Sequence, residues 1–165
     1  MSNSKYRLQT LLEIRERAEE DAKQVFAQAM AQLNQEKQTL KDMQDELERM
    51  IADRHRRREE YAQKLASGEM KVTDQAAAYR YIDRLKEKEA EQKGRIDGQR
   101  ENVREAEKQL KRAQDALIVA TQDLKALEKH KENWQTQVKK ERAAREADML
   151  DEIAQTIYQQ KNRNS

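Results

Sequence analysis

The stretch "LASGEMKVTDQAAAYRYIDRL", residues 65–85, interrupts a chain that is charged and helix-forming for dozens of residues on either side. Gly68 suits the left-handed residue that follows a helix, and Thr73 is a candidate N-cap for a second helix. Because a short connection makes sequential helices antiparallel neighbours, the stretch predicts a hairpin with its turn at about 67–72. A parallel dimer of two continuous helices stays open as the alternative, because one glycine cannot forbid it.

Composition favours long helices over a globular core. Charged residues make up 40% of the 165 residues, aromatic residues 4%, and there is no proline, a profile typical of coiled coils. Disorder is the other interpretation of so polar a chain, and regular hydrophobic spacing argues against it. The net charge is only +2, so the overall charge makes no general case for nucleic-acid binding.

Cysteine usage and hydropathy bear on the compartment. The sequence contains no cysteine, which suits a reducing environment. The first residues lack the apolar core of a secretory signal, and no run approaches the ~20 apolar residues that a membrane span needs. We therefore expect a soluble cytoplasmic protein without direct membrane insertion.

The chain after the turn carries a regular heptad pattern. With Ile82 at position a, the a series reads Ile82, Glu89, Ile96, Val103, Leu110, Leu117, Leu124, Lys131, Val138 and Arg145. The d series reads Leu85, Gln92, Gln99, Ala106, Ala113, Ala120, Leu127, Trp134 and Glu141. This pattern predicts one helix from about Thr73 to Gln160 with a left-handed supercoil, followed by a flexible tail at 161–165.

The chain before the turn shows a similar seam with one irregular step. Its seam positions read Leu8, Leu11, Arg15, Ala18, Ala22, Val25, Ala29, Leu33, Leu40, Met43, Leu47, Met50, Tyr61 and Leu65. The step of four residues between Ala29 and Leu33 indicates a stutter that locally unwinds the supercoil. We expect this first helix to run from about Ser4 to Ala66.

The expected fold is therefore all-α, a single domain in which two long helices form an antiparallel coiled-coil hairpin. Folding about residue 70 brings Leu8 near residue 132, so Trp134 should pack against Tyr6, Leu8 and Leu11. The second helix then overhangs by roughly 25 residues, about 35 to 40 Å at 1.5 Å per residue. The overhang carries apolar residues at Met149, Ile153 and Ile157.

Catalytic chemistry finds no support in the sequence, and we predict no catalytic, cofactor or metal site. Three glycines cannot build a phosphate-binding loop, and His55 and His130 lack further ligands at a zinc-binding spacing, so both are expected on the surface. The segment "RHRRR" at 54–58 could bind phosphate, but Asp53 and the following glutamates nearly neutralise it. Trp134 is most simply a core anchor.

Three segments carry a resemblance to a known family. They are the opening "YRLQTLLEIRERAEEDAK", the middle "ASGEMKVTDQAAAYRYIDRL" and the closing "KKERAAREADMLDEIAQ". In order and spacing they resemble the FliJ/YscO family, the central stalk proteins of flagellar and injectisome type III export ATPases. The resemblance covers about residues 5 to 158.

The resemblance implies a non-enzymatic stalk whose paired helix ends enter the hexameric export ATPase, at the inner membrane periphery. It also implies contact with the cytoplasmic part of the export gate and with export chaperones. The aromatic and the leucine presented to the gate fall on Tyr81 and Leu85, although Tyr81 could instead pack across the seam. The ATPase-binding region would comprise Tyr6, Leu8, Leu11, Trp134, Arg142, Arg145, Met149, Ile153 and Ile157.

The regular opening segment favours the flagellar apparatus over the injectisome. A scaffold coiled coil without an export role, and a nucleic-acid-binding helix pair using "RHRRR", are the functions of other classes that remain open.

Overall fold

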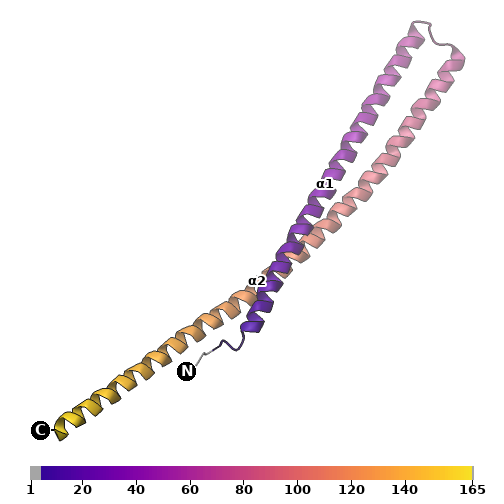
Figure 1. The fold of residues 1–165 in the computed structure, drawn as a ribbon. Helices are drawn as coiled ribbons and strands as arrows, with labels where there is room; N and C mark the ends of the chain where they lie inside the picture. The colour runs from indigo at the N-terminus through magenta and orange to yellow at the C-terminus, as the bar shows by residue number, and fades with distance from the viewer. Residues whose placement is uncertain (1–4, 165) are drawn as a thin grey trace. The chain divides into compact units, whose positions relative to one another are not determined.

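Two long helices make up the computed structural model, which describes residues 5–164 (Figure 1). Helix α1 spans Gln9–Ala66 and helix α2 spans Val72–Arg163, and the described residues contain no strand. The all-α, antiparallel hairpin prediction is thereby confirmed.

The chain divides into two compact units. A turn unit comprises Gln24–Asp115, and a terminal unit comprises Met1–Lys23 with Ala116–Ser165. That the whole chain forms a single domain stays a prediction.

The turn ends α1 through the hydrogen bonds of a Schellman motif. Gly68 has a φ of 76°, the left-handed conformation that the sequence predicts for it. Its amide donates to the Leu65 carbonyl at 3.3 Å, and the Glu69 amide donates to the Lys64 carbonyl at 3.0 Å. These bonds satisfy carbonyl groups that the end of a helix otherwise leaves unpaired, so the break falls at Gly68.

Three predicted helix boundaries need correction. Thr73 is not the N-cap, because α2 begins at Val72 and the Lys71 carbonyl already accepts the Asp74 amide at 3.0 Å. At its other end α2 runs to Arg163, so Lys161 to Arg163 are helical. Helix α1 begins at Gln9, since the preceding residues turn to place Tyr6 against α2. Positions 4 and 165 lie outside the described residues.

The turn unit packs along the predicted heptad seam of α2. Its buried cluster joins Leu33 of α1 to Val103 and Ala106 of α2, with Leu40 and Leu110 packed against it. Every buried α2 residue of this unit occupies a predicted a or d position, namely Ile82, Glu89, Gln92, Ile96, Gln99, Val103, Ala106 and Ala113. The burial confirms that seam.

Polar side chains interrupt this seam and bond across it. Glu89 Oε2 lies 2.7 Å from Arg54 Nε, with both side chains largely buried. Gln92 Nε2 donates to the Met43 carbonyl at 3.0 Å. Gln99 Nε2 likewise donates to the backbone carbonyl of Glu36 at 3.0 Å. These pairs are nearly symmetric about residue 70, so the predicted antiparallel register holds in this unit.

The terminal unit packs with leucines and aromatic residues. Leu12 of α1 forms a buried cluster with Leu124 and Leu127 of α2, and Leu8 packs against the cluster. Arg15 Nη1 donates to the Asp123 carbonyl at 2.8 Å, which ties the edges of the two helices together.

The seam predicted for α1 is wrong at four of its positions, one of which is the exposed Leu65 at the end of the helix. The other three lie in its first half. Leu12, Glu19 and Phe26 turn towards α2, whereas the predicted Leu11, Ala18 and Val25 are exposed. With Leu12, Glu19 and Phe26 in their place, the inward positions alternate steps of four and three from Leu8 to Leu33, so the predicted stutter between Ala29 and Leu33 is also wrong. The physical reason is that adjacent apolar pairs such as Leu11 and Leu12 fit either spacing, and the partner helix selects one.

Candidate functional site

The C-terminal part of α2 has an exposed apolar stripe. Every residue from Lys139 to Asn164 is exposed, so we call this segment the overhang. Met149, Ile153 and Ile157 follow one another at four-residue spacing on one helix face, with exposed fractions of 61%, 51% and 56%. Leu150 and Tyr158 widen this stripe and are more exposed still. Sequence reasoning left these two out of the candidate set, although their apolar character was visible.

Basic residues precede the stripe. Lys139, Lys140, Arg142 and Arg145 are all exposed. Arg145 Nη2 lies 3.9 Å from Glu141 Oε2, a distance that leaves its guanidinium free to turn to a partner. A shallow hollow of about 270 Å³ lies beside them, lined by Trp134, Val138, Arg142 and two polar neighbours.

The predicted ATPase-binding residues at the start of the chain divide into two groups. Tyr6 is buried, with its ring centroid 5.2 Å from that of Trp134 and its hydroxyl hydrogen-bonded to His130 Nδ1 at 2.5 Å. Leu8 belongs to the core of the terminal unit. Leu11 is exposed and does not take part in this packing. Trp134 is therefore a core anchor, and it remains half-buried rather than fully enclosed.

Tyr81 and Leu85, the predicted gate residues, are both half-buried. The Arg57 guanidinium of α1 lies 5.2 Å from the centroid of the Tyr81 ring, and that of Arg84 lies 5.8 Å from it. Such cation–π contacts are weak at exposed sites. Tyr81 thus contacts Arg57 of α1 at the edge of the core without being buried in it. Ile82 beside it is buried in the seam, as predicted.

Arg57, which contacts the Tyr81 ring, also forms an ion pair with Asp53. Arg57 Nε lies 3.0 Å from Asp53 Oδ2, and Arg56 also donates to the Asp53 carboxylate. Partial desolvation alone would raise the pKa of Asp53, but the hydrogen bonds and charges of Arg57 and Arg56 outweigh it and lower that pKa. The hydrogen bond and charge of Asp53 in turn raise the pKa of Arg57, so the guanidinium stays charged beneath Tyr81.

These contacts also engage three of the four arginines of the "RHRRR" segment. Arg54 pairs with Glu89 in the seam, while Arg56 and Arg57 share Asp53. His55 is exposed, and the described part of the chain holds no group of acidic, histidine or cysteine side chains that could bind a metal. Arg58 alone among these arginines has no ion pair within the described chain, and one free cation is weak support for the nucleic-acid alternative.

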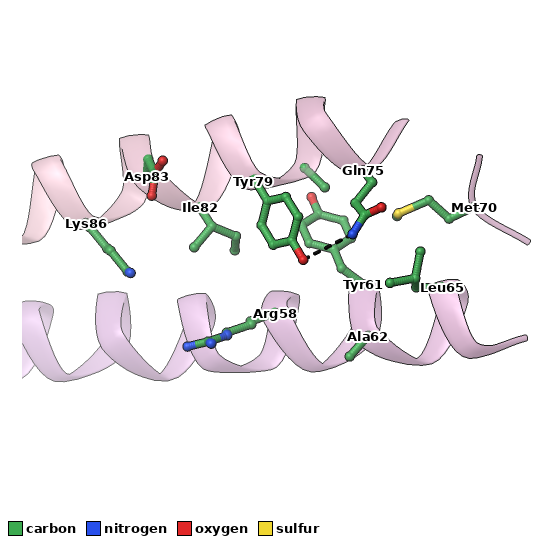
Figure 2. Close-up of a pocket in the computed structure, with 11 residues that line it drawn as sticks. Arg58, Tyr61, Ala62, Leu65, Met70, Gln75, Tyr79, Ile82, Asp83 and Lys86 are labelled. Atoms are coloured by element: carbon green, nitrogen blue, oxygen red, sulfur yellow. Dashed lines mark hydrogen bonds between the residues drawn. The ribbon is translucent and has the colours of Figure 1, made fainter. Parts of the chain in front are cut away.

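A groove between the helices beside the turn was not predicted from the sequence (Figure 2). It has a volume of about 320 Å³. Its lining residues are Arg58, Tyr61, Ala62, Leu65, Met70, Gln75, Ala78, Tyr79, Ile82, Asp83 and Lys86. Leu65, predicted as the last seam residue, is 41% exposed and forms part of this lining. Tyr79 enters the groove, whereas Tyr81 does not line it.

Over residues 5–164, neither helix contains a stretch long and apolar enough to cross a membrane.

A family comparison and a structural comparison both match the chain to YscO-like proteins. A family model described as YscO-like protein matches residues 3–164. Among solved structures, CT670 from Chlamydia trachomatis, named as a candidate YscO homolog, superposes with a TM-score of 0.78. The match covers 98% of this chain and 99% of that one at 23% sequence identity, so it speaks for the fold alone. No curated protein matches the sequence.

Proposed function

The chain belongs to the YscO-like family, and on that premise we propose that it is the stalk protein of a type III export apparatus. Its relation to type III secretion follows from the family. The proposed role is non-enzymatic: it couples a hexameric export ATPase to the cytoplasmic part of the export gate. It would act in the cytoplasm at the inner membrane periphery, and it could also engage export chaperones.

The observation that carries this proposal is the exposed stripe of the overhang. Five large apolar side chains on a helix surface, with no other part of residues 5–164 packed over them, cost free energy in water. A receptor that encloses the overhang would remove this cost. The central channel of a hexameric ATPase would enclose a single helix in this way.

The basic residues suit the same receptor. Lys139, Lys140, Arg142 and Arg145 would face carboxylates lining the channel, and such charges raise association rates and orient the helix. The packed rings of the buried Tyr6 and the half-buried Trp134 would support this contact by fixing the point at which the overhang begins. Leu11, being exposed, could touch the receptor directly.

We assign the gate contact to Tyr81 and Leu85, which lie four residues apart on one face of α2. Both are half-buried, so each retains surface for a partner. The Arg57 guanidinium contacts the face of the Tyr81 ring, and this contact reduces the conformational entropy that the ring would lose on binding.

Deletion of residues 146–165 tests the coupling role. The deletion removes the apolar stripe and leaves the packing of α1 against α2 intact in each unit. Stimulation of the export ATPase should therefore be lost while helicity per residue is retained. Stimulation is measured as ATP hydrolysis with and without the added chain, and helicity by circular dichroism. Tyr81→Ala is the matched control, because it changes a different surface and should leave the stimulation unchanged. Full stimulation by the deleted chain would overturn the proposal.

The choice of apparatus is tested with the same proteins. The opening segment favours the flagellar system, so the chain should retain the flagellar ATPase on a column more strongly than the injectisome ATPase. Stronger retention of the injectisome ATPase would reassign it within the same role.

A further inference from the structure

We propose that the groove beside the turn is a docking site for an acidic amphipathic helix of a partner protein. This inference goes beyond the stalk function, because it concerns a surface that neither the ATPase contact nor the Tyr81 contact uses.

The floor of the groove is apolar and open to solvent. Tyr61, Leu65 and Met70 line it from α1 and the turn, and Tyr79 lines it from α2 (Figure 2). Tyr79 is 60% exposed, so most of its ring is accessible to a partner. A volume of about 320 Å³ lies at the lower end of the range of about 300 to 1,000 Å³ for ligand pockets. It therefore suits the anchoring side chains of a larger partner.

The polar groups of the groove are mainly hydrogen-bond donors. Gln75 Nε2 donates to the Tyr79 hydroxyl oxygen at 3.2 Å, which leaves the tyrosine's own proton for an incoming acceptor. Lys86 extends from α2 towards α1, and Arg58 runs along α1 (Figure 2). Asp83 is the one acidic residue in the lining, and no ion pair within the described chain joins it to Arg58 or Lys86.

This donor excess defines the charge of the occupant. Three donors from Arg58, Tyr79 and Lys86 surround an apolar floor, and bonds to a carboxylate are about twice as strong as neutral ones. A basic occupant would instead set like charges against Arg58 and Lys86. The surface is therefore complementary to apolar side chains flanked by glutamate or aspartate.

The shape of the site favours a helix as the occupant. The groove runs between two antiparallel helices, whose side-chain ridges form the kind of channel into which a third helix packs. An amphipathic helix presents apolar residues three and four positions apart, with charges beside them. An extended peptide would find no strand edge here, since the described residues contain none.

A binding experiment on the full chain tests the inference. The probe is a short fluorescein-labelled helical peptide with leucines on one face and glutamates beside them, followed by fluorescence anisotropy. Tyr79→Ala should weaken binding about tenfold or more, which corresponds to about 1.4 kcal/mol. Lys86→Glu should weaken it similarly by reversing one of the charges.

Matched controls separate this site from its surroundings. Lys88→Glu reverses an exposed charge on the same helix outside the groove, so this variant should bind as the wild type does. A peptide with lysines in place of the glutamates should bind at least about tenfold more weakly. Circular dichroism verifies that each variant keeps its helix content.

Two results would overturn the inference: wild-type affinity in both Tyr79→Ala and Lys86→Glu, or equal affinity for the lysine peptide. Neither result bears on ATPase stimulation by the overhang. The proposed docking site and the proposed stalk function can therefore be contradicted independently of each other.

Discussion

The terminal unit and the turn unit close the same kind of heptad seam with different chemistry. In the terminal unit, Leu12, Leu124 and Leu127 form a small apolar core. In the turn unit, Arg54 meets Glu89 within the seam, and Gln92 bonds across to the Met43 backbone. Both arrangements hold two helices side by side, but they resist disruption in different ways.

The difference shows how stability and register are divided along one chain. Apolar contacts are non-directional, so a leucine layer stabilises a helix pair and tolerates small shifts. A largely buried ion pair adds little net stability but is costly to leave half-made. The polar layers of the turn unit therefore penalise every misaligned pairing, which suits a role in setting the antiparallel register.

The largest expected effect comes from Leu124→Ala in the terminal unit. The substitution removes a side chain that is 7% exposed from the leucine cluster. We expect a loss of about 3 kcal/mol in the local free energy of unfolding. Amide hydrogen exchange across residues 116–134 measures it. Leu150→Ala, in the exposed overhang, serves as control and should change little. Equal protection in Leu124→Ala would mean that this cluster does not hold the unit together.

An intermediate effect is expected from Glu89→Ala in the turn unit. It leaves the largely buried Arg54 guanidinium without its carboxylate. Because this side chain is still 15% exposed and water can reach it, we expect a cost of about 2 kcal/mol in the free energy of unfolding. The double variant Arg54→Met with Glu89→Leu should recover that loss, because apolar partners of similar volume replace both charges. Urea denaturation of the wild type and both variants measures these two changes in the free energy of unfolding. If the double variant were as unstable as Glu89→Ala, the pair itself would supply the stability.

The double variant also probes register. With its ion pair removed, the turn unit should admit misaligned pairings that the wild type excludes. Double electron–electron resonance between spin labels at residues 47 and 93 should then show a broader distance distribution. A distribution as narrow as in the wild type would show that this ion pair does not set the antiparallel register.

The smallest effect concerns the pH dependence of Asp53. Its pKa is lowered in the folded chain, so its charge stabilises the fold above the unfolded pKa of about 3.9. That stability is lost as the pH falls through the lower, folded value. The melting temperatures of wild type and Asp53→Asn should therefore differ at pH 6 and converge as the pH falls below about 4. A difference that persists at low pH would show that the carboxylate charge is not the cause.

Sequence reasoning succeeded most fully on α2. All residues predicted at its a and d positions from Ile82 to Leu127 are buried or half-buried in the structure. A long heptad repeat leaves little choice there, because only one face of the helix is sufficiently apolar. The overhang followed from the same arithmetic, since helix lengths and the position of Gly68 determine how many residues remain unpaired.

Helix α1 shows where such reasoning fails. Leu11 and Leu12, or Val25 and Phe26, are adjacent apolar residues that fit two different seams equally well. The contact of Leu12 with Leu124 and Leu127 decides between them. The groove beside the turn was missed for a related reason. Tyr61 and Tyr79 are distant in sequence and line one groove only after the chain folds back.

Sequence by itself determined the two long helices, the break at Gly68 and the apolar residues near the end of α2, because helix propensity, glycine backbone freedom and heptad spacing are local properties. Tertiary structure alone decided which face of α1 is buried, how Arg54 finds Glu89, and that Tyr79 lines a groove while Tyr81 leans on Arg57. Each of these depends on atoms brought from another part of the chain, and the free energy of such contacts exists only once both helices are in place.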